Sequence, residues 1–166
     1  MSRVVLILLL TLTSLAAEDY LHRWTLGAGN FNPVGKGEQS KTIGSSPMLT
    51  IDYGYHFTRN GQADMGVDLG FGDRGMKIPR FGYRAIFPFL QDRLNASLGA
   101  GAGYVFVKPP LGGYEHWLVY GQVGANYALD REKKFRPGLM IRWYRDPIGR
   151  PLMNWVTVGA EMTFGQ

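Results

Sequence analysis

The sequence predicts an all-β protein, an eight-stranded antiparallel up-and-down β-barrel whose strands cross a membrane. Three observations lead to this prediction: an N-terminal segment with the features of an export signal, apolar and polar side chains that alternate with a period of two, and the length of the alternating segments. These segments run to about 9–14 residues, whereas globular strands peak near 5–6 and a tilted membrane strand needs about 9–11.

Residues 1–17 are predicted to be a signal peptide. Arg3 supplies a short positive region, residues 4–12 are apolar, and Ala16 and Ala17 offer two small-residue cleavage positions. The apolar run is shorter than the roughly 20 residues that a spanning helix requires. We therefore expect a signal peptide at 1–17 and a single barrel domain at 18–166.

Eight segments carry the alternation. They cover residues 23–32, 49–57, 63–72, 80–89, 94–106, 116–129, 136–144 and 153–164. In the third segment, the alternating sets are Met65, Val67 and Leu69 against Asp64, Gly66 and Asp68. The first segment is the weakest, because Phe31 departs from its alternation, and we expect a β-bulge there.

The connections between the segments alternate in character. Residues 58–62, 90–93 and 130–134 are short and polar, whereas 33–47, 73–79, 108–115 and 146–151 are longer on average and rich in Gly and Pro. Membrane barrels have short periplasmic turns and longer external loops. With an even number of strands, both ends of the barrel domain are then expected on the short-turn side.

Side-chain volume decides which face of the strands points outward. One face carries Ile, Leu, Phe, Tyr and Trp, and the other carries Gly with polar and charged residues. The interior of an eight-stranded barrel is just wide enough for side chains to fill it, and glycines leave room there for paired charges. We therefore expect the apolar face to point toward lipid; in the alternative, a soluble barrel, the charges would lie on a thin, glycine-rich surface.

The last predicted strand gives the most specific resemblance to a known family. Residues 157–164 read TVGAEMTF and resemble the terminal assembly signal of small outer-membrane barrels of the OmpA transmembrane-domain and OmpX type, with Gly159, Met162 and Phe164 at its marked positions. The resemblance extends over residues 23–164 and implies location in the bacterial outer membrane and insertion by the barrel-assembly machinery. The chain departs from the family in that two residues follow the final aromatic residue.

Seven charged residues are predicted to point into the lumen. They are Asp52, Asp64, Asp68, Arg80, Arg84, Arg142 and Glu161. Because buried charges must be paired to be tolerated, we expect a charge network that fills and rigidifies the lumen. The alternative is a gated path for ions.

A second candidate site is basic and external. The predicted external loops carry Lys36, Lys41, Arg74, Lys77, Lys108, Arg145 and Arg150 against few acids. These cations are suited to contact the phosphates of lipopolysaccharide or an anionic surface partner. The alternative is that they are ordinary solvated loop residues.

Several other classes of function are not supported. The net charge of +5 comes without a dense Lys/Arg tract, so nucleic-acid binding is not expected. The chain has no cysteine and its histidines are not expected to meet, so no metal or cofactor is predicted. Neither His56 nor His116 has a serine two residues later, as lipid A deacylases require, and Ser97 has no predicted histidine partner.

The sequence therefore predicts a monomeric, non-enzymatic outer-membrane barrel with a plugged polar lumen, short external loops and a structural or surface-interaction role. Its expected partners are outer-membrane lipid, lipopolysaccharide and, during insertion, the barrel-assembly machinery. The alternatives are a narrow pore or small-solute conduit and, further away, a lipid A-modifying enzyme.

Overall fold

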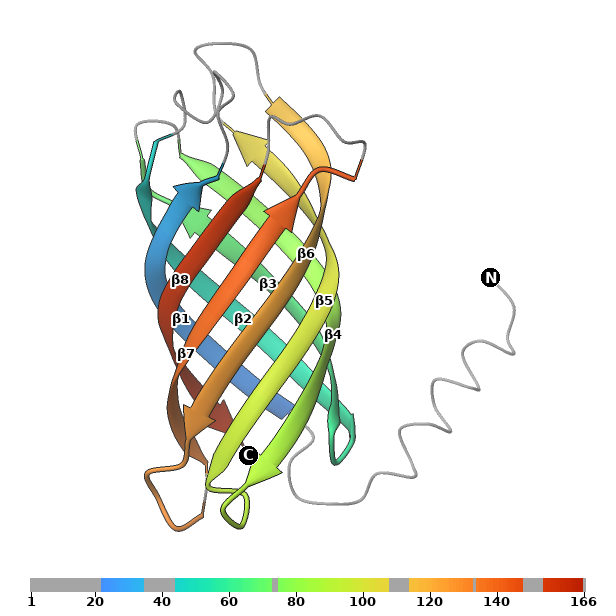
Figure 1. Cartoon of the computed structure of the whole chain (residues 1–166), viewed down its shortest axis with the longest axis vertical. Helices are drawn as coiled ribbons and strands as arrows, with labels where there is room; N and C mark the ends of the chain where they lie inside the picture. The colour runs from blue at the N-terminus through green and yellow to red at the C-terminus, as the bar shows by residue number, and fades with distance from the viewer. Residues whose placement is uncertain are drawn as a thin grey trace, which may run out of the picture.

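The structure, a computed structural model, describes residues 22–34, 44–72, 75–107, 114–132, 134–147 and 154–165. The described residues form eight strands tilted around one axis (Figure 1). The strands are β1 (His22–Pro33), β2 (Ser46–Thr58), β3 (Gly61–Gly70), β4 (Met76–Phe89), β5 (Leu94–Val107), β6 (Tyr114–Tyr127), β7 (Phe135–Arg145) and β8 (Trp155–Gly165).

The sheet is a closed antiparallel barrel in which every strand pairs with its sequence neighbours and β1 pairs with β8. This last pairing runs from Arg23 opposite Gly165 to Pro33 opposite Trp155. We call the end that holds the start of β1 and the end of β8 the terminal end, and the opposite end the loop end. The prediction of an all-β, eight-stranded up-and-down barrel is confirmed.

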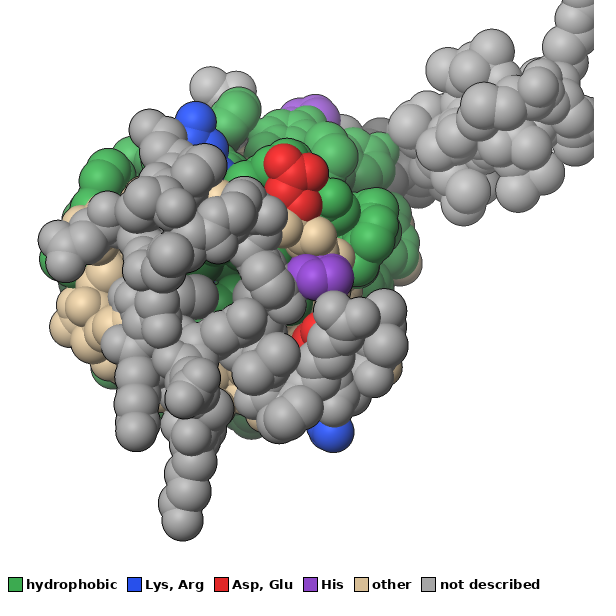
Figure 2. Space-filling model, turned by 90° about the horizontal axis from the view of Figure 1, so that it is seen from above, with side chains coloured by type: hydrophobic (Ala, Val, Ile, Leu, Met, Phe, Trp, Pro, Cys, Tyr) green, Lys and Arg blue, Asp and Glu red, His purple; other side chains and the backbone are tan. Residues whose placement is uncertain are grey.

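The apolar face of the strands points outward, as predicted. Met65 and Leu139 are 60 % and 68 % exposed, and Ile51 and Val158 are exposed as well. Figure 2 shows hydrophobic side chains around much of the circumference of the barrel. This surface suits a hydrocarbon environment and would be costly in water.

Phe31 does not mark a bulge, and that expectation was wrong. It lies opposite Ser46 of β2 and Thr157 of β8 in an uninterrupted register, points inward and is fully buried. The irregular register that the pairing does contain lies in β2, between His56 and Thr58. The inward parity of β1 is therefore regular, and Phe31 is a lumen residue.

Strand β4 begins earlier than the sequence suggested. Residues 73–79 were expected to be a loop because they contain glycine and proline, but β4 starts at Met76. Pro79 still pairs with Val67 of β3, whereas the pairing with β5 omits Ile78 and Pro79. A proline lacks the N–H for one ladder bond, but it does not prevent the backbone from continuing as a strand.

The turns at the terminal end are held by local hydrogen bonds. In the β6–β7 turn, a carboxylate oxygen of Asp130 accepts from the backbone N–H of Phe135 at 2.9 Å and another accepts from Lys134 at 3.0 Å. These two hydrogen bonds hold the pKa of Asp130 below its usual value.

Within the described part of the chain, no helix has the length and apolar character needed to span a membrane.

Candidate functional site

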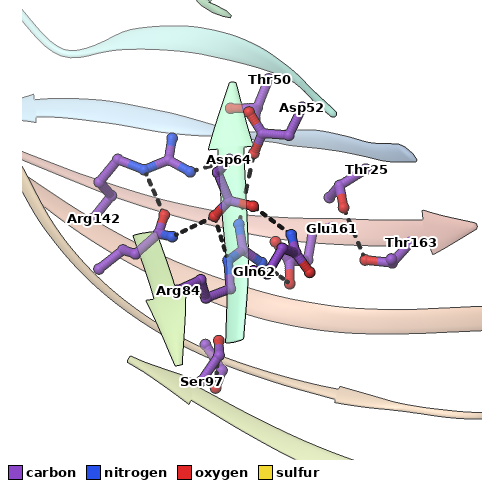
Figure 3. A network of polar contacts seen from close by, with 12 residues as sticks. Thr25, Thr50, Asp52, Gln62, Asp64, Arg84, Ser97, Arg142, Glu161 and Thr163 are labelled. Atoms are coloured by element: carbon purple, nitrogen blue, oxygen red, sulfur yellow. Dashed lines mark hydrogen bonds and ion pairs between the residues drawn. The ribbon is translucent and has the colours of Figure 1, made fainter. Parts of the chain in front are cut away.

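The structure brings all seven predicted lumen charges together in the middle of the barrel. Asp52 comes from β2, Asp64 and Asp68 from β3, Arg80 and Arg84 from β4, Arg142 from β7, and Glu161 from β8. Each is at most 5 % exposed. The alternation of each strand directs these side chains inward, and Figure 3 shows several of them converging from different strands.

Asp68 is the most heavily bonded carboxylate of this network. Its two oxygens accept from Nη1 of Arg142 at 2.9 and 2.8 Å, and its Oδ1 lies 3.3 Å from both Nε and Nη2 of Arg80. The hydroxyl of Thr50 donates to Oδ1 at 2.8 Å, and the hydroxyl of Tyr144 donates to Oδ2. Asp68 thus joins three other strands to β3.

Arg84 organises the half of the network nearer the terminal end. Its Nε donates to Asp64 at 2.9 Å, and its Nη groups lie 3.8 Å from Asp52 and 4.0 Å from Glu161. Asp52 in turn pairs with Nη2 of Arg80 and lies 3.6 Å from Arg142. The four carboxylates exceed the three arginines of the network by one.

Uncharged side chains that were not predicted as site residues complete the network. Gln122 donates to Asp64 at 3.3 Å and accepts from Nε of Arg142 at 3.0 Å, and Gln62 also donates to Asp64. The ring of Tyr120 lies 5.7 and 5.6 Å from the guanidinium carbons of Arg80 and Arg142. Their inward position on alternating strands was the signal that could have identified them.

Glycines make the space that this network occupies. A Cβ atom added at Gly66 would lie 1.8 Å from Oδ1 of Asp52, and one added at Gly82 would lie 2.2 Å from the hydroxyl of Tyr120. A larger residue at either of these inward glycines would therefore clash with a side chain of the network.

Toward the loop end, the lumen is filled by buried apolar side chains that we call the apolar layer. Its members are Phe31, Met48, Met76, Ile78, Val105, Leu118 and Trp155, packed against Tyr120 and Tyr144. The ring of Phe31 lies 4.9 Å from that of Trp155 and 6.5 Å from that of Tyr144. On β3, Gly70 faces this layer, and Met76 lies over it. The sequence predicted a polar lumen, and at this end the buried inward side chains are apolar instead.

Toward the terminal end, the network borders a polar cavity that we call the lumen pocket. Uncharged polar side chains form most of its wall: Thr25, Gln62, Asn95, Ser97, Asn126 and Thr163. Arg23, Arg84 and Ile86 also line it. The hydroxyl of Ser97 lies 3.4 Å from the carbonyl oxygen of Gly124, and those of Thr25 and Thr163 are 3.1 Å apart.

Two of the predicted external basic residues can be placed, and both lie in strands. Lys77 is the second residue of β4 and Arg145 is the last of β7, so their assignment to loops was wrong. Both are exposed on the outer face at the loop end. Lys36, Lys41, Arg74, Lys108 and Arg150 lie outside the described residues.

The residues of the predicted assembly signal are part of the barrel closure. Gly159 is buried opposite Gly29 of β1, and Met162 and Phe164 point outward. The ring of Phe164 packs edge-on against Phe135 of β7 at 5.6 Å. Within the described residues, no group of three His, Cys, Asp or Glu side chains is arranged to hold a metal ion.

Comparison with known proteins gives matches in structure but not in sequence. No protein-family model matches the chain, and no curated protein matches it. The N-terminal β-barrel domain of Pseudomonas aeruginosa OprF matches with a TM-score of 0.69 at 9 % identity, over 90 % of this chain and 100 % of that one. Neisserial surface protein A matches with a TM-score of 0.61 at 14 % identity, over 88 % and 97 %. The chain has the fold of the small eight-stranded outer-membrane barrels.

A third match is to a barrel whose name refers to attachment and invasion. The attachment invasion locus protein Ail of Yersinia pestis has a TM-score of 0.57 at 10 % identity, over 89 % of this chain and 99 % of Ail. At these identities the likeness establishes the fold of the chain and leaves its role to be argued from its own residues.

Proposed function

We propose that the protein is an integral barrel of the bacterial outer membrane, with a lumen closed to ions and a structural or surface-interaction role without enzymatic activity. The observation that carries the proposal is the inverted distribution of side chains: apolar residues outside, and a bonded charge network within. In this proposal, the terminal end faces the periplasm and the loop end faces the exterior, as short turns and long loops do in such barrels.

Membrane residence and closure of the lumen can be tested on the purified wild-type protein. The folded barrel is expected to migrate anomalously on an SDS gel unless boiled, and to fractionate with outer membranes. In planar bilayers it is expected to show no stable conductance, because the apolar layer and the charge network fill the lumen. A large, stable conductance would replace the closed lumen by a pore, and a freely soluble periplasmic protein would overturn the membrane assignment.

The absence of enzymatic activity is a separate expectation. The hydroxyl of Ser97 lies beside a main-chain carbonyl group, an arrangement that does not activate a nucleophile. The mass spectrum of lipid A from cells that produce the protein should therefore match that from cells without it. A new or missing acyl chain would assign the barrel to lipid modification.

We propose that the surface interaction includes lipopolysaccharide, through Lys77 and Arg145. Both cations point outward at the loop end, on the side of the barrel where Tyr104 contacts Phe106 at 4.9 Å and Trp117 at 5.2 Å. Aromatic residues favour the level of the headgroups, and long basic side chains beside them can reach phosphates.

Removing both cations is expected to weaken binding to purified lipopolysaccharide. Since each basic residue near an anionic surface contributes about 1 kcal/mol, the Lys77→Gln/Arg145→Gln variant should bind at least about tenfold more weakly at low salt. The matched control is Arg59→Gln, which removes an exposed cation from the terminal end. Equal binding by both variants would show that these two strand residues are not the site.

A further inference from the structure

We propose that the loop-end part of β7, β8 and β1 binds one molecule of lipid A: Arg145 holds a phosphate, and the amide of Asn30 bonds to the groups that attach the acyl chains. This inference rests on the proposed interaction with lipopolysaccharide, and it adds the part of the lipid that a second residue recognises. The three strands are neighbours in the closed sheet and lie side by side in Figure 1.

Asn30 is a polar side chain in the apolar outer surface of the barrel. It points outward from β1 and is exposed, and the residues directly opposite it, Pro47 and Val158, are exposed and apolar. Within the described residues the side-chain amide of Asn30 makes no hydrogen bond, whereas the amide of Asn32 accepts one from Ser45 at 2.7 Å. An amide without a partner is costly in hydrocarbon, and this side chain is too short to extend to the headgroups as a lysine does.

The strand register sets the heights of Asn30 and Arg145. Asn30 lies opposite Val158 of β8, which lies opposite Ile141 of β7. Because the strands are tilted by about 40°, each of these two steps descends about 3 Å toward the terminal end, and each residue along a strand spans about 2.5 Å of height. Arg145 is four residues beyond Ile141 toward the loop end, so it lies about 4 Å above Asn30.

The surface between these two residues is apolar and open. Val156 and Val158 point outward from β8, and Val158 is 49 % exposed. On β7, the indole ring of Trp143 lies over Gly121 of β6, where an added Cβ atom would be 2.1 Å from its Cζ2. The ring therefore leans away from β8 and leaves the two valines uncovered, so that acyl chains can lie against them.

The chemistry of lipid A matches this arrangement. Its disaccharide carries phosphates, and its acyl chains are attached a few ångströms deeper through amide and ester groups and carry hydroxyl groups. Arg145 is exposed and makes no ion pair with any residue that the structure describes, so its guanidinium group can pair with a phosphate. The two residues are two strands apart, about 13 Å around the barrel, a distance that a disaccharide and an arginine side chain together span.

The amide of Asn30 distinguishes lipid A from other anionic lipids. An asparagine amide both donates and accepts hydrogen bonds. The amide, ester and hydroxyl groups of lipid A can satisfy both of these at the level of Asn30. A glycerophospholipid such as phosphatidylglycerol carries a phosphate and ester carbonyl groups, but at this depth it has no donor for the amide oxygen.

Binding of lipid A can be measured by native mass spectrometry of the full chain refolded in detergent. Asn30→Leu removes the amide and keeps a side chain of similar size. The matched control is Asn60→Leu, which makes the same change at an exposed position in the β2–β3 turn, at the terminal end. Each protein is titrated with purified lipid A and, separately, with phosphatidylglycerol, after heat-modifiable migration has shown that it is folded.

Asn30→Leu should bind lipid A about two- to tenfold more weakly than the wild type, the range for the loss of one hydrogen bond. Its binding of phosphatidylglycerol should change less, and Asn60→Leu should bind both lipids as the wild type does. Arg145→Gln should weaken the binding of both lipids, because both carry a phosphate.

Unchanged binding of lipid A by Asn30→Leu, or an equal loss with phosphatidylglycerol, would contradict the proposal. A wild-type dimer without lipid that becomes a monomer in Asn30→Leu would instead assign the amide to a second copy of the chain. If only Lys77→Gln/Arg145→Gln loses binding, the proposed lipopolysaccharide surface stands without the Asn30 site. If neither that variant nor Asn30→Leu loses binding, both proposals fail.

Discussion

Replacing Asp68 with alanine is expected to lower the free energy of unfolding by about 3–5 kcal/mol, the range for breaking a buried ion pair from one side. Asp68 accepts from Arg142 and Arg80 and from the hydroxyl groups of Thr50 and Tyr144. Its removal leaves two buried guanidinium groups with a smaller share of carboxylate and creates a gap between β3 and β7. Unfolding by urea in detergent micelles, followed by tryptophan fluorescence and by gel migration, measures the loss.

The control for this prediction is an ion pair at the surface. Arg59 lies 3.4 Å from Asp92 and is 79 % exposed. Exposed pairs contribute at most about 1 kcal/mol, so Arg59→Ala should change stability little. If Asp68→Ala costs no more than Arg59→Ala, the lumen charges are well hydrated, and the charge network does not hold the barrel together.

The conductance of the same variant tests whether the apolar layer or the charge network blocks ions. Asp68→Ala keeps every side chain of the apolar layer, although Tyr144, against which the layer packs, loses its hydrogen bond to Asp68. The variant should therefore remain closed in planar bilayers although it is less stable. Stable openings in Asp68→Ala would instead place the barrier to ions in the charge network.

The sequence predicted those features that depend on the parity of a strand. Alternation with a period of two assigns each side chain to one face, and the choice of the outward face followed from volume and charge. For this reason the sequence alone predicts the eight strands, the outward position of residues such as Ile51 and Val158, and the inward position of Asp52 and Arg142.

The alternation does not show at which height along the barrel axis each inward residue lies. Met48 shares its face with Thr50 and Asp52, but one belongs to the apolar layer and the others to the polar network. The start of β4 was also placed too late, which assigned Met76 and Ile78 to a loop and concealed their part in the layer. The height of a side chain in the lumen depends on how neighbouring strands are staggered. The alternation within one segment does not reveal this stagger.

Replacing Gly29 with alanine is expected to cost about 3 kcal/mol or to prevent closure of the barrel, at the upper end of overpacking effects. Gly29 of β1 lies opposite Gly159 of β8, in the pairing that joins the two ends of the sheet. A Cβ atom at Gly29 would lie 2.3 Å from the carbonyl oxygen of Val158 and 2.6 Å from the Cα of Gly159. These are backbone atoms, so the strands themselves must separate to admit it.

Gly27 provides a control two residues away on the same face of the same strand. There an added Cβ atom comes no closer than 3.2 Å to the carbonyl oxygen of Ala160, which small shifts can relieve. Both substitutions reduce the freedom of the unfolded chain equally, by an amount that stabilises the fold by up to about 1 kcal/mol. The difference between the two variants therefore isolates the steric effect at the β1–β8 pairing.

Refolding yield, read as the fraction of protein in the heat-modifiable band, measures this difference. Gly27→Ala should refold close to the wild-type yield, whereas Gly29→Ala should lose most of the folded band, because an unclosed sheet exposes two unpaired edges. Equal yields would mean that β1 and β8 can move apart at Gly29 without loss of pairing. The glycine pair would then be a consequence of close strand approach and not a condition for closing the barrel.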